Sequence, residues 1–130
     1  QNNIPGLVAL ADADLMIILI RFRALPDAQM RYIDDYLKSG KPILGMRTAT
    51  HAFKFDTGPI QSSYAHYGNY YKEHDIWQGG FGKLILGEKW IAHHGAHGQQ
   101  STLGIVPKAS RDHPVFKGIF PGGIWGSTDV

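Results

Sequence analysis

The sequence predicts an α/β fold with a mostly parallel sheet, and three features lead to this prediction. Residues 15–20 and residues 43–46 form apolar runs of strand length, typical of strands covered on both faces. Between them, residues 27–39 place apolar side chains at helical spacing. A strand, a helix and a second strand in this order form a βαβ unit, whose two strands are parallel and whose crossover is right-handed.

Length and composition restrict the kind of protein. The chain has 130 residues, 43% hydrophobic and 18% charged, enough for one packed core, so a single domain over residues 1–130 is expected. The net charge is only +2 and the Lys and Arg residues are scattered, which argues against a nucleic-acid partner. The absence of cysteine excludes disulfides, thiolate metal ligands and a cysteine nucleophile. No apolar stretch is long enough for a membrane span, no signal peptide is present in this stretch, and the compartment stays open.

The helix of the βαβ unit has clear start and stop signals. Before the first strand, residues 4–13 have helical spacing and are expected to be the end of an earlier helix. Pro26 and Asp27 suit the first turn of the helix that follows the strand, and Gly40 suits the position just after its end. Its apolar face consists of Met30, Ile33 and Leu37.

Cationic side chains follow both predicted strands. Arg21 and Arg23 come after the first strand, and Arg47 and His51 come after the second. Because parallel strands end at the same edge of a sheet, these four residues should meet there and suit an anionic or strongly polar ligand. Thr48 or Thr50 would cap the short helix that begins at this edge and contribute to the ligand site. The alternative is that the arginines pair with carboxylates or lie over the rim of the sheet.

Residues 56–78 form a long polar and aromatic segment without a sustained period, which predicts a loop. Its rings and imidazoles are Tyr64, His66, Tyr67, Tyr70, Tyr71, His74 and Trp77. Such side chains stack on and hydrogen-bond to sugars, and Tyr67 is one candidate ligand contact. The other interpretation is that they pack the loop onto its own domain.

Residues 79–104 are rich in glycine but do not match a dinucleotide-binding loop. The glycines of residues 79–82 precede an apolar run, whereas a dinucleotide loop follows a strand and opens a helix. Further on, His93, His94 and His97 lie within five residues and could bind Zn²⁺ or a similar ion, although the nearby glycines argue against a helical metal motif. General acid–base chemistry and a structural role in a tight loop are the alternatives.

The last third of the chain has few signals. Residues 101–107 contain Leu103, Ile105 and Val106 and predict another strand. Residues 112–118 predict a turn, a short apolar anchor and a Gly stop, in which His113 fixes the turn. Residues 122–130 show no helix signal.

Three segments together resemble those of a known family. They are the run Gly45-Met46-Arg47-Thr48-Ala49-Thr50-His51-Ala52-Phe53 with the helix and strand before it, residues 81–98, and Asp112-His113-Pro114 followed by Gly118. Their order and spacing are similar to those of the ThuA-like (trehalose-utilisation) family, and the resemblance runs from about residue 6 to residue 129. That family is similar to the class I glutamine amidotransferase superfamily, which implies a flavodoxin-like fold of three layers. It also implies sugar or oxidised-sugar metabolism.

The resemblance also implies roles for individual residues. Arg47 falls on the third position of the glutamine amidotransferase nucleophile elbow, where that superfamily has its cysteine. An arginine cannot accept an acyl group, so glutaminase activity is excluded. Asp129 lies near the late acidic position of the family. Arg47, His51 and at least one residue of the His93, His94 and His97 group are expected to line one site, where a fixed cation and an imidazole would act on a polarised sugar.

A flavodoxin-like domain begins with a strand that has no counterpart in these residues, so the resemblance implies an incomplete copy at the N-terminus and at the C-terminus. A sheet without its first strand exposes strand edges and an apolar patch, which missing segments of the chain or a homo-oligomer would cover. Three functions follow from the sequence: an enzyme of sugar metabolism, a non-catalytic binding module of a carbohydrate-processing protein, and a metalloenzyme that uses the histidine loop. The expected ligand is a small sugar-like molecule, with neither a nucleic acid nor a membrane as partner, and Zn²⁺ or a similar ion is the only cofactor considered.

Overall fold

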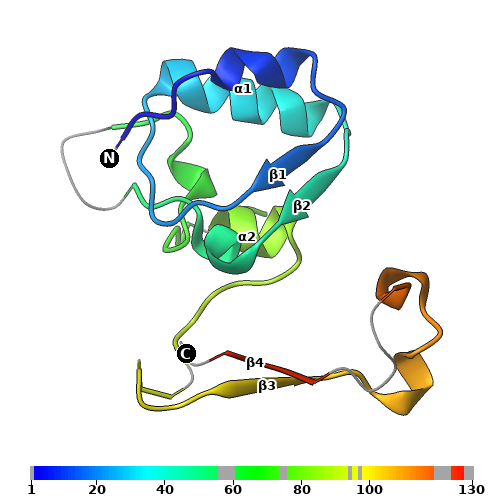
Figure 1. Cartoon of the computed structure of the whole chain (residues 1–130). Helices are drawn as coiled ribbons and strands as arrows, with labels where there is room; N and C mark the ends of the chain where they lie inside the picture. The colour runs from blue at the N-terminus through cyan, green and yellow to red at the C-terminus, as the bar shows by residue number, and fades with distance from the viewer. Residues whose placement is uncertain are drawn as a thin grey trace. The chain divides into compact units, whose positions relative to one another are not determined.

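The computed structural model describes residues 2–55, 61–73, 76–93, 95–96, 98–118 and 124–127, the last four by backbone only (Figure 1). The chain divides into two compact units, Gln1–Trp90 and Ile91–Val130. Each unit is described by itself. Within the described ranges, no helix combines the length and the apolar character needed to cross a membrane.

The first unit contains the predicted βαβ element. Strand β1 spans Met16–Ile18, helix α1 spans Asp27–Lys38, and strand β2 spans Ile43–Gly45. The two strands pair in parallel, with Met16 opposite Ile43 and Ile18 opposite Gly45. The prediction of two adjacent parallel strands joined by a helix is therefore confirmed, although both strands are shorter than the apolar runs suggested.

Helix α1 forms where the sequence signals place it. Asp27 in the first turn and Lys38 in the last turn complement the helix dipole. Gly40 follows the helix with φ +70°, the left-handed conformation that glycine adopts without steric cost. The Asp27 carboxylate also accepts hydrogen bonds from the hydroxyl groups of Ser62 (2.6 Å) and Ser63 (2.7 Å). These bonds hold the loop against the start of the helix and lower the pKa of the Asp27 carboxyl below its usual value.

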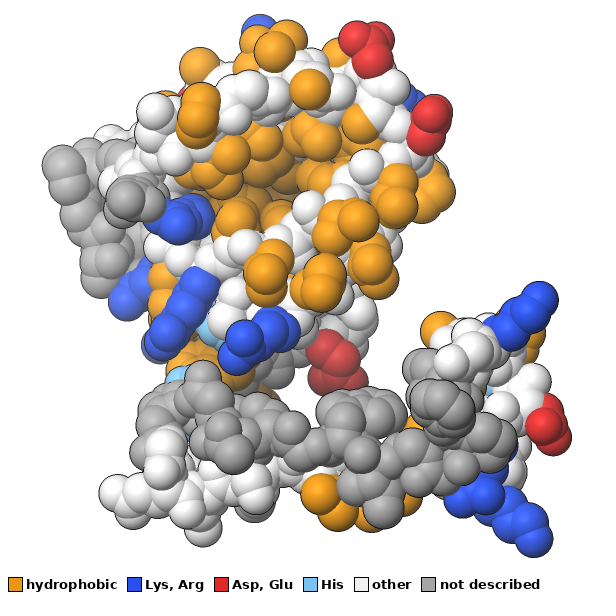
Figure 2. Space-filling model, viewed as in Figure 1, with side chains coloured by type: hydrophobic (Ala, Val, Ile, Leu, Met, Phe, Trp, Pro, Cys, Tyr) orange, Lys and Arg blue, Asp and Glu red, His pale blue; other side chains and the backbone are white. Residues whose placement is uncertain are grey.

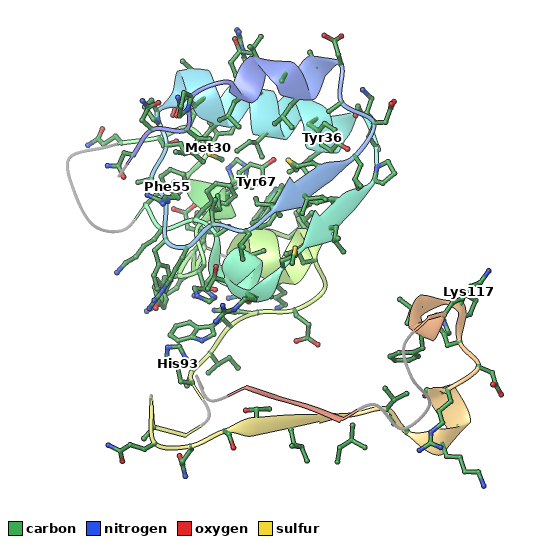
Figure 3. All side chains as sticks on the ribbon, in the orientation of Figure 1. Met30, Tyr36, Phe55, Tyr67, His93 and Lys117 are labelled. Atoms are coloured by element: carbon green, nitrogen blue, oxygen red, sulfur yellow. The ribbon has the colours of Figure 1, made fainter. Side chains whose placement is uncertain are left out.

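The core of the first unit lies between α1 and one face of the strands. Met16 and Ile18 of the strands pack there with Met30 and Ile33 of α1. Figure 3 shows Met30, Tyr36 and Tyr67 directed into this interior. The Tyr36 hydroxyl donates a hydrogen bond to the carbonyl oxygen of Pro42 (2.6 Å), which fixes the end of the helix to the start of β2.

The opposite face of the strands is exposed. Burial alternates along β1, so that Ile17 is 58% exposed between two buried neighbours. The other side chains of this face are also about half exposed: Leu15, Leu19, Leu44 and Met46. We call these five residues the outer face. The expectation of strands covered on both faces is thus wrong for the described residues, because the helices of this unit pack against only one face.

Short helices complete the first unit: η1 (Leu7–Ala11), η2 (Arg47–His51), η3 (Ala65–Tyr67) and α2 (Gly80–Ile85). The helical spacing of residues 4–13 thus corresponds to the 3₁₀ helix η1, which packs against α1. The glycines at 79 and 80, at φ +96° and +71°, lead into α2. The expectation that these glycines precede an apolar run instead of opening a helix is therefore wrong. The argument against a dinucleotide fold still holds, because a turn rather than a strand precedes it.

The aromatic segment packs onto its own unit. Tyr67 is 2% exposed, and its ring lies 4.5 Å from the ring of Trp77 and 6.0 Å from that of Phe53, centroid to centroid. The Tyr67 hydroxyl donates a hydrogen bond to the Asp34 carboxylate (2.8 Å), which also pairs with Lys38 (2.6 Å). Burial and this hydrogen bond raise the pKa of Tyr67. The loop-packing interpretation therefore holds for Tyr67, which lies in the core and is not a ligand contact.

The second unit contains the predicted strand β3 (Thr102–Ile105), which pairs antiparallel with β4 (Ile124–Ser127). Helices η4 (Lys108–Ser110) and η5 (Pro114–Phe116) follow β3. His113 accepts a hydrogen bond from the backbone N–H of Val115 at Nδ1 (3.2 Å), which confirms its role in fixing the turn. The chain is therefore an α/β protein with a short two-stranded parallel sheet, and its second sheet is antiparallel.

Candidate ligand site at the ends of the parallel strands

Both parallel strands are followed by a residue in a strained backbone conformation. Phe22 comes after β1 with φ +47°, and Arg47 comes after β2 with φ +45°. Among the described residues, these are the only two that adopt positive φ without being glycine. Bulky side chains are uncommon in this region, where each such residue costs about 1–3 kcal/mol and is retained only if its surroundings enforce it. Strain of this kind is concentrated at binding and active sites.

Hydrogen bonds between the two strand ends enforce this geometry. The backbone N–H of Phe22 donates to the carbonyl oxygen of His51 (3.0 Å), and that of Arg23 donates to the carbonyl oxygen of Ala52 (2.7 Å). The N–H of Lys54 donates back to the carbonyl oxygen of Arg23 (2.9 Å). Parallel pairing therefore resumes beyond η2, at a bridge between Arg23 and Phe53.

Four rings gather where these strand ends meet. The ring of Phe22 lies 4.8 Å from that of His51, 6.0 Å from that of Tyr70 and 5.8 Å from that of Trp90, centroid to centroid. His51 and Trp90 are 4.9 Å apart. We call Phe22, His51, Tyr70 and Trp90 the ring cluster. Its members come from four separate segments, so tertiary contact and not sequence proximity assembles it.

Positive charges lie over the ring cluster. The guanidinium of Arg21 lies 5.4 Å from the centroid of the Phe22 ring. The ammonium of Lys54 lies 5.7 Å from the same ring and 5.3 Å from that of Tyr70. These are cation–π distances, worth about 0.5–1 kcal/mol each where the site is exposed. The rings therefore hold the Lys54 ammonium in a defined place while leaving its hydrogen-bond donors for other groups.

An open cavity of about 640 Å³ adjoins the ring cluster, because Tyr70 of the cluster and Lys54, which lies over it, both line the cavity. The residues lining the cavity are Lys54, Phe55, Ala65, Gly68, Tyr70, Tyr71, Lys72 and Glu73. Its size is that of a pocket for a small molecule. The Tyr71 hydroxyl donates a hydrogen bond to the Glu73 carboxylate (2.7 Å), so the acidic group among the described lining residues already has a partner. The described part of the lining therefore combines aromatic walls with two lysines and one glutamate.

The structure brings together the cations that the sequence placed at this edge. Arg21 and Arg23 come three and five residues after the end of β1, and Arg47 comes two residues after the end of β2, at the edge that the βαβ geometry predicted. Arg21 and Arg47 are exposed. His51 is at the same edge but only 4% exposed, because its ring packs against both Phe22 and Trp90. The imidazole is therefore packed within the ring cluster and does not face solvent.

The threonines do not act as predicted. Met46 is the residue before η2, and no side chain caps that helix, so the capping prediction for Thr48 and Thr50 is wrong. The Thr48 hydroxyl instead donates a hydrogen bond to the carbonyl oxygen of Ile20 (3.0 Å). The Thr50 hydroxyl lies 3.4 Å from Nδ1 of His51. Thr48 therefore fixes η2 to the end of β1 and is engaged within the protein.

The predicted histidine site can be followed only in part. His93 is exposed and belongs to the second unit, so a single site that joins it to Arg47 and His51 stays a prediction. His94, His97 and Asp129 lie outside the described residues. Within the part of the chain that the structure describes, no group of three His, Asp or Glu side chains could hold a metal ion.

Sequence reasoning missed Phe22, Lys54 and Trp90 as members of the site. The only signal was the position of Phe22 between two arginines just after an apolar strand. Lys54 and Trp90 lie far from it in the sequence, and nothing in their local pattern predicts contact. The sequence matches no family model, and no curated protein or solved structure is similar enough to give a match.

Proposed function

We propose that this protein binds a small, negatively charged, sugar-like molecule, of the chemical class of an oxidised sugar with a carboxylate, at the ends of the parallel strands. One observation carries the proposal: Tyr70 belongs both to the ring cluster and to the wall of the cavity, and Lys54, whose ammonium lies over the Tyr70 ring, lines the same cavity. A ligand in the cavity would therefore meet an ammonium group and an aromatic face at once.

The chemistry of the lining suits this class of ligand. The C–H face of a sugar ring packs on an aromatic ring, and Tyr70 is 37% exposed with its ring held in place by Phe22. A carboxylate forms charge-assisted hydrogen bonds with ammonium groups, which Lys54 and Lys72 supply. A neutral sugar would gain only the stacking contact, so the site should prefer the acid.

The backbone of Arg47 supports the resemblance to ThuA-like proteins and, through them, to a flavodoxin-like fold. A nucleophile elbow is a strained turn between a strand and a helix that presents one side chain at the sheet edge. Arg47 has φ +45°, follows β2 and begins η2, and its side chain is exposed. In this proposal the elbow presents a guanidinium in place of a nucleophile, so the position attracts an anion and does not attack a carbonyl group.

Between the enzyme and the binding module, the burial of His51 favours binding without turnover. A general acid or base must come within hydrogen-bond reach of the substrate. His51 is 4% exposed and covered by Phe22 and Trp90, so it positions the rings and does not transfer a proton in this arrangement. The protein is thus proposed as a sugar-acid binding module of carbohydrate metabolism.

The test is a titration of ¹⁵N-labelled protein with a hexuronate, with the matched neutral hexose and with inorganic phosphate. We expect the hexuronate to shift the amide resonances of Lys54 and Tyr70 and to bind more tightly than the hexose. Lys54→Gln should weaken hexuronate binding by roughly 10- to 100-fold, because a hydrogen bond to a charged group is worth about 1.5–3 kcal/mol. Lys108→Gln, which removes the same charge from η4 in the second unit, is the matched control and should have no effect.

Equal affinity for the hexose and the hexuronate would contradict the role of charge. Phosphate binding as strong as that of the hexuronate, and equally sensitive to Lys54→Gln, would show a general anion site without sugar recognition. Consumption of the hexuronate during the titration would favour the enzyme over the binding module.

A further inference from the structure

The outer face of the parallel strands is an aliphatic surface without polar side chains. Leu15, Ile17, Leu19, Leu44 and Met46 are 49, 58, 52, 50 and 44% exposed, respectively. Ile17 and Leu44 are opposite each other in the register, so the five side chains form two adjoining rows. Parallel strands are nearly always buried on both faces, which makes a bare face of this kind unusual. Figure 2 shows hydrophobic side chains gathered over this part of the first unit.

The two ends of the outer face carry opposite charges. Asp12 and Asp14 precede β1 and are exposed at the amino end of the strands. The Lys41 ammonium at the same end donates hydrogen bonds to the carbonyl oxygens of Ala11 (3.2 Å) and Ala13 (3.0 Å). Exposed arginines, Arg21 and Arg47, follow the strands at the carboxyl end. Figure 2 shows acidic side chains at the upper right of the hydrophobic side chains and basic ones at the lower left, with acidic atoms also visible at the lower end.

We propose that the outer face binds a second copy of this chain, with the strands of the two copies antiparallel. A two-fold axis in the plane of the interface and perpendicular to the strands brings the two outer faces together. The same rotation places the amino end of one copy over the carboxyl end of the other. Asp12 and Asp14 of each copy then face Arg21 and Arg47 of the other. An axis parallel to the strands would instead oppose acid to acid and arginine to arginine, which like-charge repulsion disfavours.

The size of the outer face limits the strength of this dimer. Five aliphatic side chains, each about half exposed, provide roughly 400 Å² of apolar surface, within the range of the largest patches on monomeric proteins. A stable dimer buries about 800 Å² on each copy. The dimer should therefore be weak and concentration-dependent, with the charged ends contributing orientation more than affinity.

Sedimentation velocity over an approximately hundredfold range of protein concentration tests the proposal. The sedimentation coefficient should rise with concentration towards that of a dimer, since association follows mass action. Ile17→Asp places a charge in the centre of the outer face and should abolish the rise. Val8→Asp, on η1 at a residue that is 60% exposed, is the matched control and should leave it unchanged. A chain that stays monomeric at every concentration, or a dimer that survives Ile17→Asp, would overturn the proposal.

A charge exchange tests the orientation independently of the apolar contact. Asp14→Arg and Arg21→Asp should each weaken the dimer by about tenfold, because each sets like charges against one another across the interface. The double variant Asp14→Arg/Arg21→Asp restores opposite charges in the antiparallel arrangement and should recover most of the lost affinity. If the double variant loses as much dimer affinity as the two single variants together, the antiparallel dimer is refuted. The single variants also show by circular dichroism whether the fold is retained.

Discussion

The strained turn at Arg47 makes a prediction about stability that can be tested by comparing two truncations. Arg47→Gly and Arg47→Ala both remove the exposed side chain together with its contacts, so the difference between them isolates the backbone at φ +45°. A left-handed conformation costs a residue with a Cβ about 1–2 kcal/mol. Glycine loses about 0.4–1 kcal/mol more backbone entropy on folding than alanine. The glycine variant should therefore be more stable than the alanine variant by about 1 kcal/mol.

Urea unfolding followed by circular dichroism, which reports mainly on α1, measures this difference. An increment of about 1 kcal/mol corresponds to a shift of roughly 0.3–1 M in the unfolding midpoint. The control is the same pair at Asp35, an exposed position inside α1, where alanine should be more stable than glycine by about 1 kcal/mol. The order of glycine and alanine should thus reverse between the two positions.

Equal stability of the alanine and glycine variants at position 47 would contradict this prediction. In that case the turn stores no strain, and the comparison with a nucleophile elbow loses its structural support. If the prediction holds, the hexuronate titration of the glycine variant also shows whether the strained arginine contributes to binding.

Further predictions concern buried and titrating groups. Tyr67→Phe removes the donor to the buried Asp34 carboxylate and should lower the free energy of unfolding by about 1–3 kcal/mol. Tyr70→Phe at the exposed edge is the control and should lower it little. Equal losses in the two variants would contradict the assignment of Tyr67 to the core. Burial and this hydrogen bond raise the pKa of Tyr67 in the folded state. The contribution of Tyr67 to the free energy of unfolding is therefore complete below its unfolded pKa near 10 and is lost as the pH rises further. Tyr67→Phe should reduce this loss in urea titrations at alkaline pH. The folded structure lowers the pKa of the Asp27 carboxyl. Its contribution to the free energy of unfolding is therefore present above the unfolded pKa near 4 and is lost as the pH falls through the folded pKa. Ser62→Ala should reduce this acid-side loss, and an unchanged pH profile would show that the hydrogen bond does not stabilise the fold.

Local sequence patterns were enough to predict the βαβ element and the edge at which the cations meet. Apolar runs of strand length and a helical spacing with a proline start and a glycine stop are local patterns, and they predicted β1, α1 and β2. The parallel order then follows from chain connectivity, which puts Arg21 and Arg47 at one edge without knowledge of any contact. The role of His113 was predictable for the same reason, because its hydrogen bond spans only two residues.

The identity of the side chains that form the site depends on tertiary contacts. The contacts of Phe22 with Tyr70 and Trp90 join distant segments of the chain. Hydrophobic spacing predicts that a residue is buried, but it does not predict which other residues cover it. The same limit applies to Tyr67 and His51, since an aromatic residue in a loop has the same local sequence whether it covers a core or contacts a ligand. The apolar runs themselves did not predict the outer face, although the resemblance implied an exposed apolar patch. A continuous apolar run has the composition of a strand buried on both faces, whereas only the packing of the helices determines that one face stays exposed.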